Sequence, residues 1–290
     1  IRVMTTTQVM TTTAGPVGAG RAPATGEPIA MLSAGPVRVL LSDAPADIVA
    51  AQRLRYRVFS EEPGFSDRIG DHDTGRDADR FDDFAQQLIV RHDDDGVIGC
   101  ARLLAPVRAA AAGGWYSATE FDLRALDPIA ARTVEMGRAC VDSAHRSGSV
   151  TALMWASVLR HLDLTGLRYV MGSVSVPLRG SLGAPRGAEL RSVRDRLVER
   201  HLAPWRTEPL VPPRVDGTAL DDIAPYPETA LPPLLRGYLR LGARVCGEPA
   251  VDEVFDVGDF LTVIDRDGAT RRYLDRLTST VTRLAGSGGR

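Results

Sequence analysis

The chain has 290 residues, 44% of them hydrophobic, which is enough to fill the core of one large domain or two small ones. Its formal net charge is −2, yet all 35 basic residues are arginine and none is lysine, so Schiff-base catalysis, a P-loop and a lysine general base are excluded. Three cysteines, with no CxxC pair and one thiol left over in any pairing, predict a reducing, cytoplasmic compartment.

The charges are unevenly distributed along the chain. Residues 61–95 hold twelve acidic side chains against four arginines, which disfavours a nucleic acid as partner. Residues 179–206 hold seven arginines against three acidic side chains and favour an acidic partner. Because no apolar run approaches the roughly 20 residues needed to span a bilayer, we expect a soluble or membrane-peripheral protein.

The two ends of the chain differ in composition from its middle. Residues 1–36 are rich in Thr, Ala, Gly and Pro and repeat the sequence Val-Met-Thr-Thr-Thr, which predicts a disordered tail. We expect a single globular domain over residues 37–275 and a flexible tail over residues 276–290.

Apolar periodicity predicts alternating strands and helices within this domain. In chain order we expect a strand (37–41), a helix (48–58), a hairpin (87–92 and 97–104), a strand (132–141), a helix (149–164), a strand (167–174), a helix (188–202), a Pro-rich stretch (203–227), an amphipathic helix (231–243) and two strands (near 244–246 and 260–264). This order predicts an α/β (α+β) fold with a mixed, mostly antiparallel central sheet and helices on both faces.

The turn Arg146-Ser-Gly148 connects the strand 132–141 to the helix that begins at Ser149. A helix N-terminus preceded by glycine offers free N–H groups to a phosphate. An ordinary strand-to-helix turn has the same short pattern, so both interpretations remain open at this point.

Several spaced polar residues form a larger pattern. In chain order they are Arg55 and Phe59, the aromatic Phe65, Asp79 and Asp82, Arg102 in Arg-Leu-Leu, and Glu135 and Arg138 in Glu-Met-Gly-Arg. This set resembles the acyl-homoserine-lactone synthases, which have a GNAT-like fold and take acyl groups from acyl carrier protein.

A more extensive resemblance is to the ornithine N-acyltransferases. It rests on Leu54-Arg-Tyr-Arg-Val-Phe59, Arg80-Phe-Asp-Asp, Tyr116-Ser-Ala-Thr-Glu-Phe-Asp-Leu123, Val134-Glu-Met-Gly-Arg-Ala-Cys-Val141, His201-Leu-Ala-Pro204 and the long block over residues 231–249. The similarity covers about residues 38–266. It departs at Ser173-Val-Ser-Val-Pro177, where the family usually has Cys-Ala-Ser-Leu-Pro-Gly.

The resemblance implies a GNAT-like domain that transfers a long 3-hydroxyacyl chain directly to the α-amine of ornithine. The donor is the phosphopantetheine thioester of acyl carrier protein, or acyl-CoA, and no metal or redox cofactor is needed. Arg146, Gly148 and Ser149 are expected to bind the phosphopantetheine phosphate. A lipid product implies contact with the inner face of the plasma membrane.

Glu135 is the candidate general base, because a buried carboxylate with a raised pKa can take the proton of an amino-acid ammonium. A buried ion pair of Glu135 with Arg138 or Arg55 is the structural alternative. We expect Cys140 to pack in the core rather than to form a covalent intermediate, since no histidine lies nearby in sequence.

The remaining polar residues are candidates for binding the acceptor and the carrier. Arg55, Arg102 and Arg138 can bind the acceptor's carboxylate, and Asp79 and Asp82 its side-chain ammonium; pairing among these residues is the alternative. Arg236, Arg240 and Arg244 form a stripe on the helix 231–243 that either docks the acidic carrier protein or is simply solvated.

Other functions stay open on the sequence alone. Within enzymes, they are a synthase of the acyl-homoserine-lactone type and an acetyl-CoA-dependent GNAT. Outside enzymes, a catalytically silent GNAT-fold protein that binds acyl thioesters is the alternative.

Overall fold

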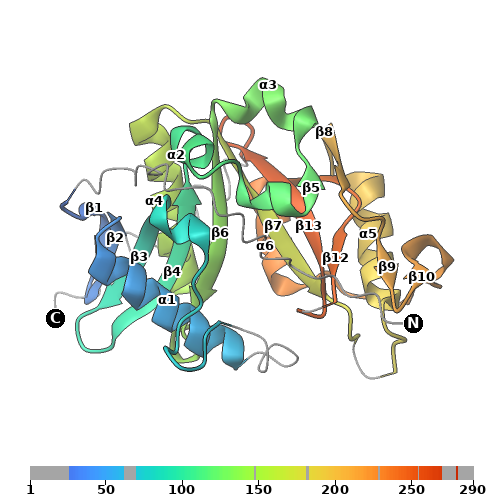
Figure 1. The fold of residues 1–290 in the computed structure, drawn as a ribbon, viewed down its shortest axis with the longest axis horizontal. Helices are drawn as coiled ribbons and strands as arrows, with labels where there is room; N and C mark the ends of the chain where they lie inside the picture. The colour runs from blue at the N-terminus through green and yellow to red at the C-terminus, as the bar shows by residue number, and fades with distance from the viewer. Residues whose placement is uncertain are drawn as a thin grey trace, which may run out of the picture.

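The computed structural model describes residues 26–61, 70–146, 148–180, 183–227, 229–253, 255–269 and 279. Its main sheet has the strand order β1-β2-β3-β4-β6-β7-β13-β11-β8-β5, with β12 paired to β13, within the described part of the chain (Figure 1). The pairs β6–β7 and β11–β8 are parallel and the other pairs are antiparallel. The predicted mixed, mostly antiparallel sheet is therefore confirmed.

The elements of the sheet and its helices follow the expected order closely. The strands are β1 (Ile29–Ala34), β2 (Val37–Ser42), β3 (Gln86–His92), β4 (Gly96–Leu104), β5 (Phe121–Asp122), β6 (Thr133–Val141), β7 (Tyr169–Pro177), β8 (Leu202–Pro209), β11 (Arg244–Gly247), β12 (Ala250–Asp252) and β13 (Val257–Asp265); β9 (Arg214–Val215) and β10 (Thr218–Ala219) form a separate hairpin. The α-helices are α1 (Pro45–Ser60), α2 (Pro106–Ala111), α3 (Asp127–Ala130), α4 (Ser149–Thr165), α5 (Ala188–Arg200) and α6 (Pro233–Leu241). Short 3-10 helices include η1 (Arg80–Asp83), η2 (Tyr116–Thr119) and η3 (Arg124–Leu126).

Helices cover both faces of the sheet, as predicted. On one face, α4, α5 and α6 bury their apolar sides in the largest core cluster, which takes in Leu153, Leu190 and Leu235. On the other face, α1 packs over β3, β4 and β6, where Leu54 lies in a smaller cluster. Residues 115–130 cover the neighbouring part of this second face and bury Phe121 against β7 and β13 (Figure 1). The α1 face is therefore covered by two separate segments, and the candidate site lies where they meet.

Two parts of the chain differ from expectation. The disorder expected over residues 1–36 is wrong for β1, which forms a hairpin with β2 and so extends the sheet; residues 1–25 lie outside the described residues. The Pro-rich stretch 203–227 contains most of β8. Its pairing with β11 is irregular, with a register shift between Val245 and Gly247, and irregular pairing tolerates prolines that a regular ladder would not. The tail expected over residues 276–290 lies outside the described residues except for Ser279.

Candidate active site

Strands β6 and β7 lie side by side only at one end. They pair in parallel over residues 133–135 and 169–171, and no further pairing joins them in the described part of the chain. Past this point a bulge interrupts the pairing of β6 with β4, and Arg138 has a positive φ of 49°. A Cβ added at Gly137 would meet no other atom within 4 Å. The two strands diverge, and the edge of β6 over residues 137–141 has no strand partner on the β7 side (Figure 1).

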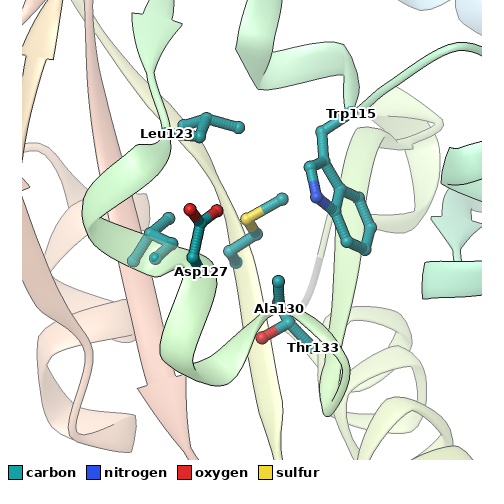
Figure 2. Close-up of a pocket in the computed structure, with 7 residues that line it drawn as sticks. Trp115, Leu123, Asp127, Ala130 and Thr133 are labelled. Carbon is teal, nitrogen blue, oxygen red and sulfur yellow. The ribbon is translucent and has the colours of Figure 1, made fainter.

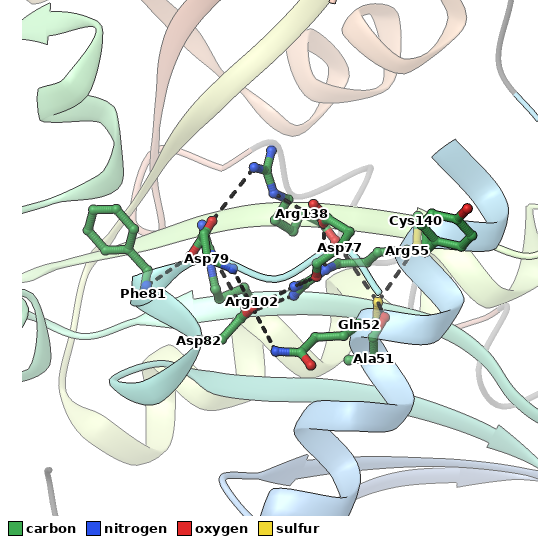
Figure 3. A network of polar contacts seen from close by, with 12 residues as sticks. Ala51, Gln52, Arg55, Asp77, Asp79, Phe81, Asp82, Arg102, Arg138 and Cys140 are labelled. Atoms are coloured by element: carbon green, nitrogen blue, oxygen red, sulfur yellow. Dashed lines mark hydrogen bonds and ion pairs between the residues drawn. The ribbon is translucent and has the colours of Figure 1, made fainter. Parts of the chain in front are cut away.

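A network of arginines and aspartates lies beside this divergence, on the α1 face (Figure 3). Its members are Arg55 on α1, Arg102 on β4, Arg138 on β6, and Asp77, Asp79 and Asp82 around the start of η1. The structure thus brings together five of the residues that the sequence predicted for substrate binding or catalysis, and it adds Asp77 to them.

Arg55 is the centre of this network and has no exposed surface. Its guanidinium donates to both oxygens of Asp82 at 2.9 and 2.7 Å, and its Nε lies 2.9 Å from Asp77 Oδ2. Burial favours a raised pKa for the Asp82 carboxyl, but the hydrogen bond and charge of Arg55, together with the charge of Arg102, outweigh it and lower this pKa to about 2. Arg55 and Asp82 therefore form a buried ion pair.

Arg102 and Arg138 are less completely paired. Arg102 Nη1 lies 2.6 Å from Asp79 Oδ1 and 3.4 Å from Asp82 Oδ1, and the residue is 3% exposed. The guanidinium of Arg138 keeps longer distances, 3.4 Å to Asp77 and 3.6 Å to Asp79, and its side chain is 23% exposed. It also lies 5.2 Å from the centroid of the Tyr116 ring. Among the three arginines of the network, Arg138 thus has the most exposed side chain and the longest ion-pair distances.

Glu135 is 3% exposed, and protein donors occupy both of its carboxylate oxygens. Oε2 accepts the backbone N–H of Tyr116 at 2.7 Å, and Oε1 accepts the backbone N–H and the hydroxyl of Ser117 at 2.7 and 2.6 Å. Burial raises the pKa of Glu135, and the bonds from Ser117 and Tyr116 oppose that rise. The ion pair considered as an alternative, with Arg138 or Arg55, is not found in the described structure. Glu135 instead fixes η2 to β6.

Two carboxyl groups that the sequence did not single out interact electrostatically with Arg138. Glu120 follows η2, and its pKa is raised to about 8 by burial and by the charges of Asp259 and Asp252. Asp259, on β13, has a pKa raised to about 6 by burial, although Ser175 Oγ donates to its Oδ1 at 2.5 Å. Glu120 belongs to the block 116–123 that carried the family resemblance. Nothing in the sequence around Glu120 indicated burial, because a glutamate side chain is usually solvated.

The predicted phosphate-binding turn leads into α4. Gly148 has a φ of 87° directly before the helix, and no side chain caps the first turn. A Cβ at Gly148 would meet nothing within 4 Å, so the approach to the first turn of the helix is open here. Arg146 Nε donates to Val141 O at 3.1 Å, and Ser149 is the first residue of the helix. Ser147 lies outside the described residues.

The other predicted residues lie apart from this network. Arg236 and Arg240 are exposed on α6 and Arg244 is exposed directly after it, while Leu235, Tyr238 and Leu241 form the buried side of that helix. Phe59 packs at the edge of the cluster under α1. Phe65 lies outside the described residues.

Cys140 is a buried packing residue, as expected. Its Sγ lies 3.6 Å from Cys100 Sγ on the paired strand β4, and that contact and burial raise the pKa of the Cys140 thiol well above its ordinary value. A neutral thiol is a poor nucleophile. In the described residues there is also no group of three or more His, Cys, Asp or Glu side chains placed to hold a metal ion, and no helix long and apolar enough to cross a membrane.

A mostly apolar pocket lies under the segment that covers β7. Its lining comprises Trp115, Leu123, Leu126, Asp127, Ala130, Thr133 and Met171 (Figure 2). The pocket begins at the strand end where β6 and β7 are still paired. Met171 pairs with Glu135 at the last position of the parallel ladder, so the pocket lies next to the divergence.

Comparison with known proteins places the chain in a family. The family of the acetyltransferase (GNAT) domain matches residues 54–156. An L-ornithine N(alpha)-acyltransferase of Rhodobacter capsulatus is 30% identical over 81% of this chain and 92% of that protein, and one of Rhizobium meliloti is 33% identical over 81% and 82%. The chain belongs to the L-ornithine N(alpha)-acyltransferase family. It is therefore an acyltransferase with a GNAT-like fold, as the sequence predicted.

A similarity to solved structures was found as well. A CoA-dependent acyl-homoserine lactone synthase, solved with SAM and isopentyl-CoA, aligns with 82% of this chain and 83% of its own at 16% identity and a TM-score of 0.45.

Proposed function

We propose that this acyltransferase moves a long-chain 3-hydroxyacyl group from the thioester of acyl carrier protein to the α-amine of ornithine, giving a lyso-aminolipid. The observation that carries the proposal is the similarity to relatives that are named for ornithine, which extends over 81% of the chain. The amine attacks the thioester carbonyl, the C–N bond forms, the C–S bond breaks, and the pantetheine thiol leaves with a proton.

The donor thioester lies, in this proposal, at the divergence of β6 and β7. The open space beside Gly137 leaves room for the thioester, and the unpaired backbone edge of residues 137–141 offers N–H groups to the oxygen of the tetrahedral intermediate. The uncapped first turn of α4, with Gly148, Ser149 and Arg146, binds the phosphate of phosphopantetheine. The pocket around Trp115 and Met171 takes the first part of the acyl chain.

The acceptor binds on the α1 face in front of the thioester. Arg138 binds its carboxylate, because its side chain is partly exposed and its guanidinium has only long contacts with protein carboxylates. Glu135 acts on the site indirectly. Its carboxylate holds η2, and this places the Tyr116 ring against Arg138. Two ion pairs stabilise the part of the site beneath the acceptor. They join Arg55 to Asp82 and Arg102 to Asp79.

The exposed arginines of α6 dock the acidic carrier protein, and the enzyme works in the cytoplasm in peripheral contact with the membrane that receives its product. Arg236 and Arg240 are exposed on α6 and Arg244 is exposed at the start of β11, where charge complementarity accelerates association. No cofactor enters the proposal, since the donor thioester supplies the driving force.

The test is a product assay with purified enzyme and 3-hydroxyacyl carrier protein. Ornithine, lysine, glycine, serine and S-adenosylmethionine are offered separately, and products are identified by mass. We expect a long-chain amide of ornithine. A homoserine lactone as main product supports the lactone synthase instead, an acetylated amine formed from acetyl-CoA supports the acetyltransferase, and carrier binding without any product supports a silent thioester-binding protein.

A further inference from the structure

The carboxylates first expected to bind the side-chain ammonium of the acceptor already form ion pairs with arginines. Asp82 is paired with Arg55, Asp79 with Arg102, and Asp77 with Arg55. An ornithine side chain carries an ammonium group, and a buried ammonium group needs a carboxylate partner. Its partner must therefore come from elsewhere on the same face of the sheet.

Glu120 and Asp259 meet this need. Asp259 is 8% exposed, and its neighbour across the β7–β13 pair is Ser175, whose hydroxyl binds one carboxyl oxygen. Glu120 Oε2 is fully buried and has no hydrogen-bond partner, and no ion pair to an arginine is found for either carboxyl among the described residues. The backbone of Glu120 is fixed, because its carbonyl accepts the N–H of Leu210 at 2.8 Å. A buried polar atom without a partner costs free energy unless a ligand satisfies it.

We infer that Glu120 and Asp259 bind the side-chain ammonium of the acceptor and so select a dibasic amino acid. This inference rests on the proposed function, because it places the acceptor's carboxylate on Arg138. Both carboxyl groups interact electrostatically with Arg138. One substrate can therefore place its carboxylate at the guanidinium and extend its side chain towards the pair.

The charge of the pair suits a single ammonium group. The groups facing Glu120 are Asp259, Asp252 and Glu135 on neighbouring strands and Arg138 on β6. Burial and the neighbouring carboxylates raise the pKa of both Glu120 and Asp259, which favours retention of a proton by the pair in the free enzyme. An arriving ammonium ion lowers the pKa of Glu120, whose proton then leaves to solvent. Binding of a dibasic acceptor should therefore release protons.

The experiment compares ornithine with norvaline, which has the same chain length and no side-chain amine. We expect wild-type kcat/KM to favour ornithine strongly, and E120Q and D259N each to reduce that preference roughly 10–100-fold while norvaline is used as before. The matched control is D122N, which removes a carboxylate two residues from Glu120 that is paired with Arg124 outside the site. It should leave the preference unchanged.

Each outcome decides one point. Equal losses with ornithine and norvaline overturn the inference and make the pair a proton acceptor for the α-amine. An unchanged preference in E120Q and D259N also overturns it. If neither variant folds, calorimetry of the wild type in buffers of different ionisation enthalpy decides, because proton release with ornithine but not with norvaline is required. A wild type that acylates neither amine contradicts the proposed function itself rather than this inference.

Discussion

Glu135 and Ser117 are joined twice, because the carboxylate of Glu135 accepts both the backbone N–H and the hydroxyl of Ser117, at 2.7 and 2.6 Å. The contact ties β6 to η2, and η2 leads directly to Glu120. Glu135, which sequence reasoning proposes as a general base, is in the structure the anchor of the segment that leads to Glu120.

This contact predicts the behaviour of the E135Q variant. The amide group of glutamine would place N–H donors against the backbone N–H of Tyr116, so one buried hydrogen bond is lost and about 1–3 kcal/mol of unfolding free energy with it. Urea denaturation measures the change, and S117A, which removes only the hydroxyl bond, should lose less. Unaltered stability combined with a roughly 10²–10⁴-fold drop in turnover would instead establish Glu135 as the general base.

The Arg55–Asp82 pair predicts a large and pH-dependent loss of stability in D82N. Removing one partner of a buried pair leaves an uncompensated charge and costs roughly 3–5 kcal/mol. The native pKa of Asp82 is about 2 and its ordinary value is 3.8, so the stabilisation is complete above pH 3.8 and is lost as the pH falls towards 2. The difference between wild type and D82N should shrink in that window.

The control for this prediction is D93N, which removes the carboxylate of the exposed Arg38–Asp93 pair. An exposed pair contributes at most about 1 kcal/mol, so D93N should unfold close to the wild type at every pH. A D82N variant as stable as D93N at neutral pH would contradict the account of the network.

Two glycines that lie on β6 and β7 should respond in opposite ways to substitution. A Cβ at Gly172 would lie 2.2 Å from Met136 O, so G172A must shift the backbone and should lower the melting temperature markedly. Gly137 has open space instead, so G137V should fold but fill the room proposed for the thioester, lowering kcat/KM roughly 10²-fold. Thermal melts and a thiol-release assay separate the two effects, and a fully active G137V would move the thioester elsewhere.

The arginines of α6 give a prediction about the donor. Replacing Arg236, Arg240 and Arg244 by glutamine should raise the KM for acyl carrier protein and flatten its salt dependence, because exposed charges act mainly on association. Turnover of a small acyl-pantetheine donor should be retained. The same replacement at the exposed Arg38, Arg53 and Arg124 is the control. If both triple variants have the wild-type KM at low salt, the α6 stripe is only a solvated surface.

The sequence predicted the structure best where hydrophobic periodicity or residue spacing indicates an element or a cluster. Strands β3, β4 and β6 and helix α4 agree with expectation to within a residue or two at each end. The expected clustering of Arg55, Asp82 and Arg102 is also correct. The alternative of pairing among these residues is what the contacts show, and spacing alone cannot tell whether an arginine also faces a substrate.

Other features depend on tertiary packing and left no local pattern to find. Glu120 is half-buried because residues 115–130 cross the sheet, and Asp259 is buried because β13 lies inside that sheet. Strand β8 is held by its neighbours despite Pro204 and Pro209, and β1 by its hairpin with β2. In each case, long-range contacts rather than intrinsic propensity decide the outcome.

The short junction between β6 and β7, here called the seam, also determines how easily the two parts of the sheet separate locally. Backbone pairing between β6 and β7 is limited to residues 133–135 and 169–171, so the ladder that links β1–β4 to β7 and β13 is short. Local opening at such a seam costs less than global unfolding, and the amides of residues 137–141 should exchange with deuterium early in the free enzyme. A donor lying across the seam would contact both sides and slow that exchange, which makes occupancy of the site measurable without a single turnover.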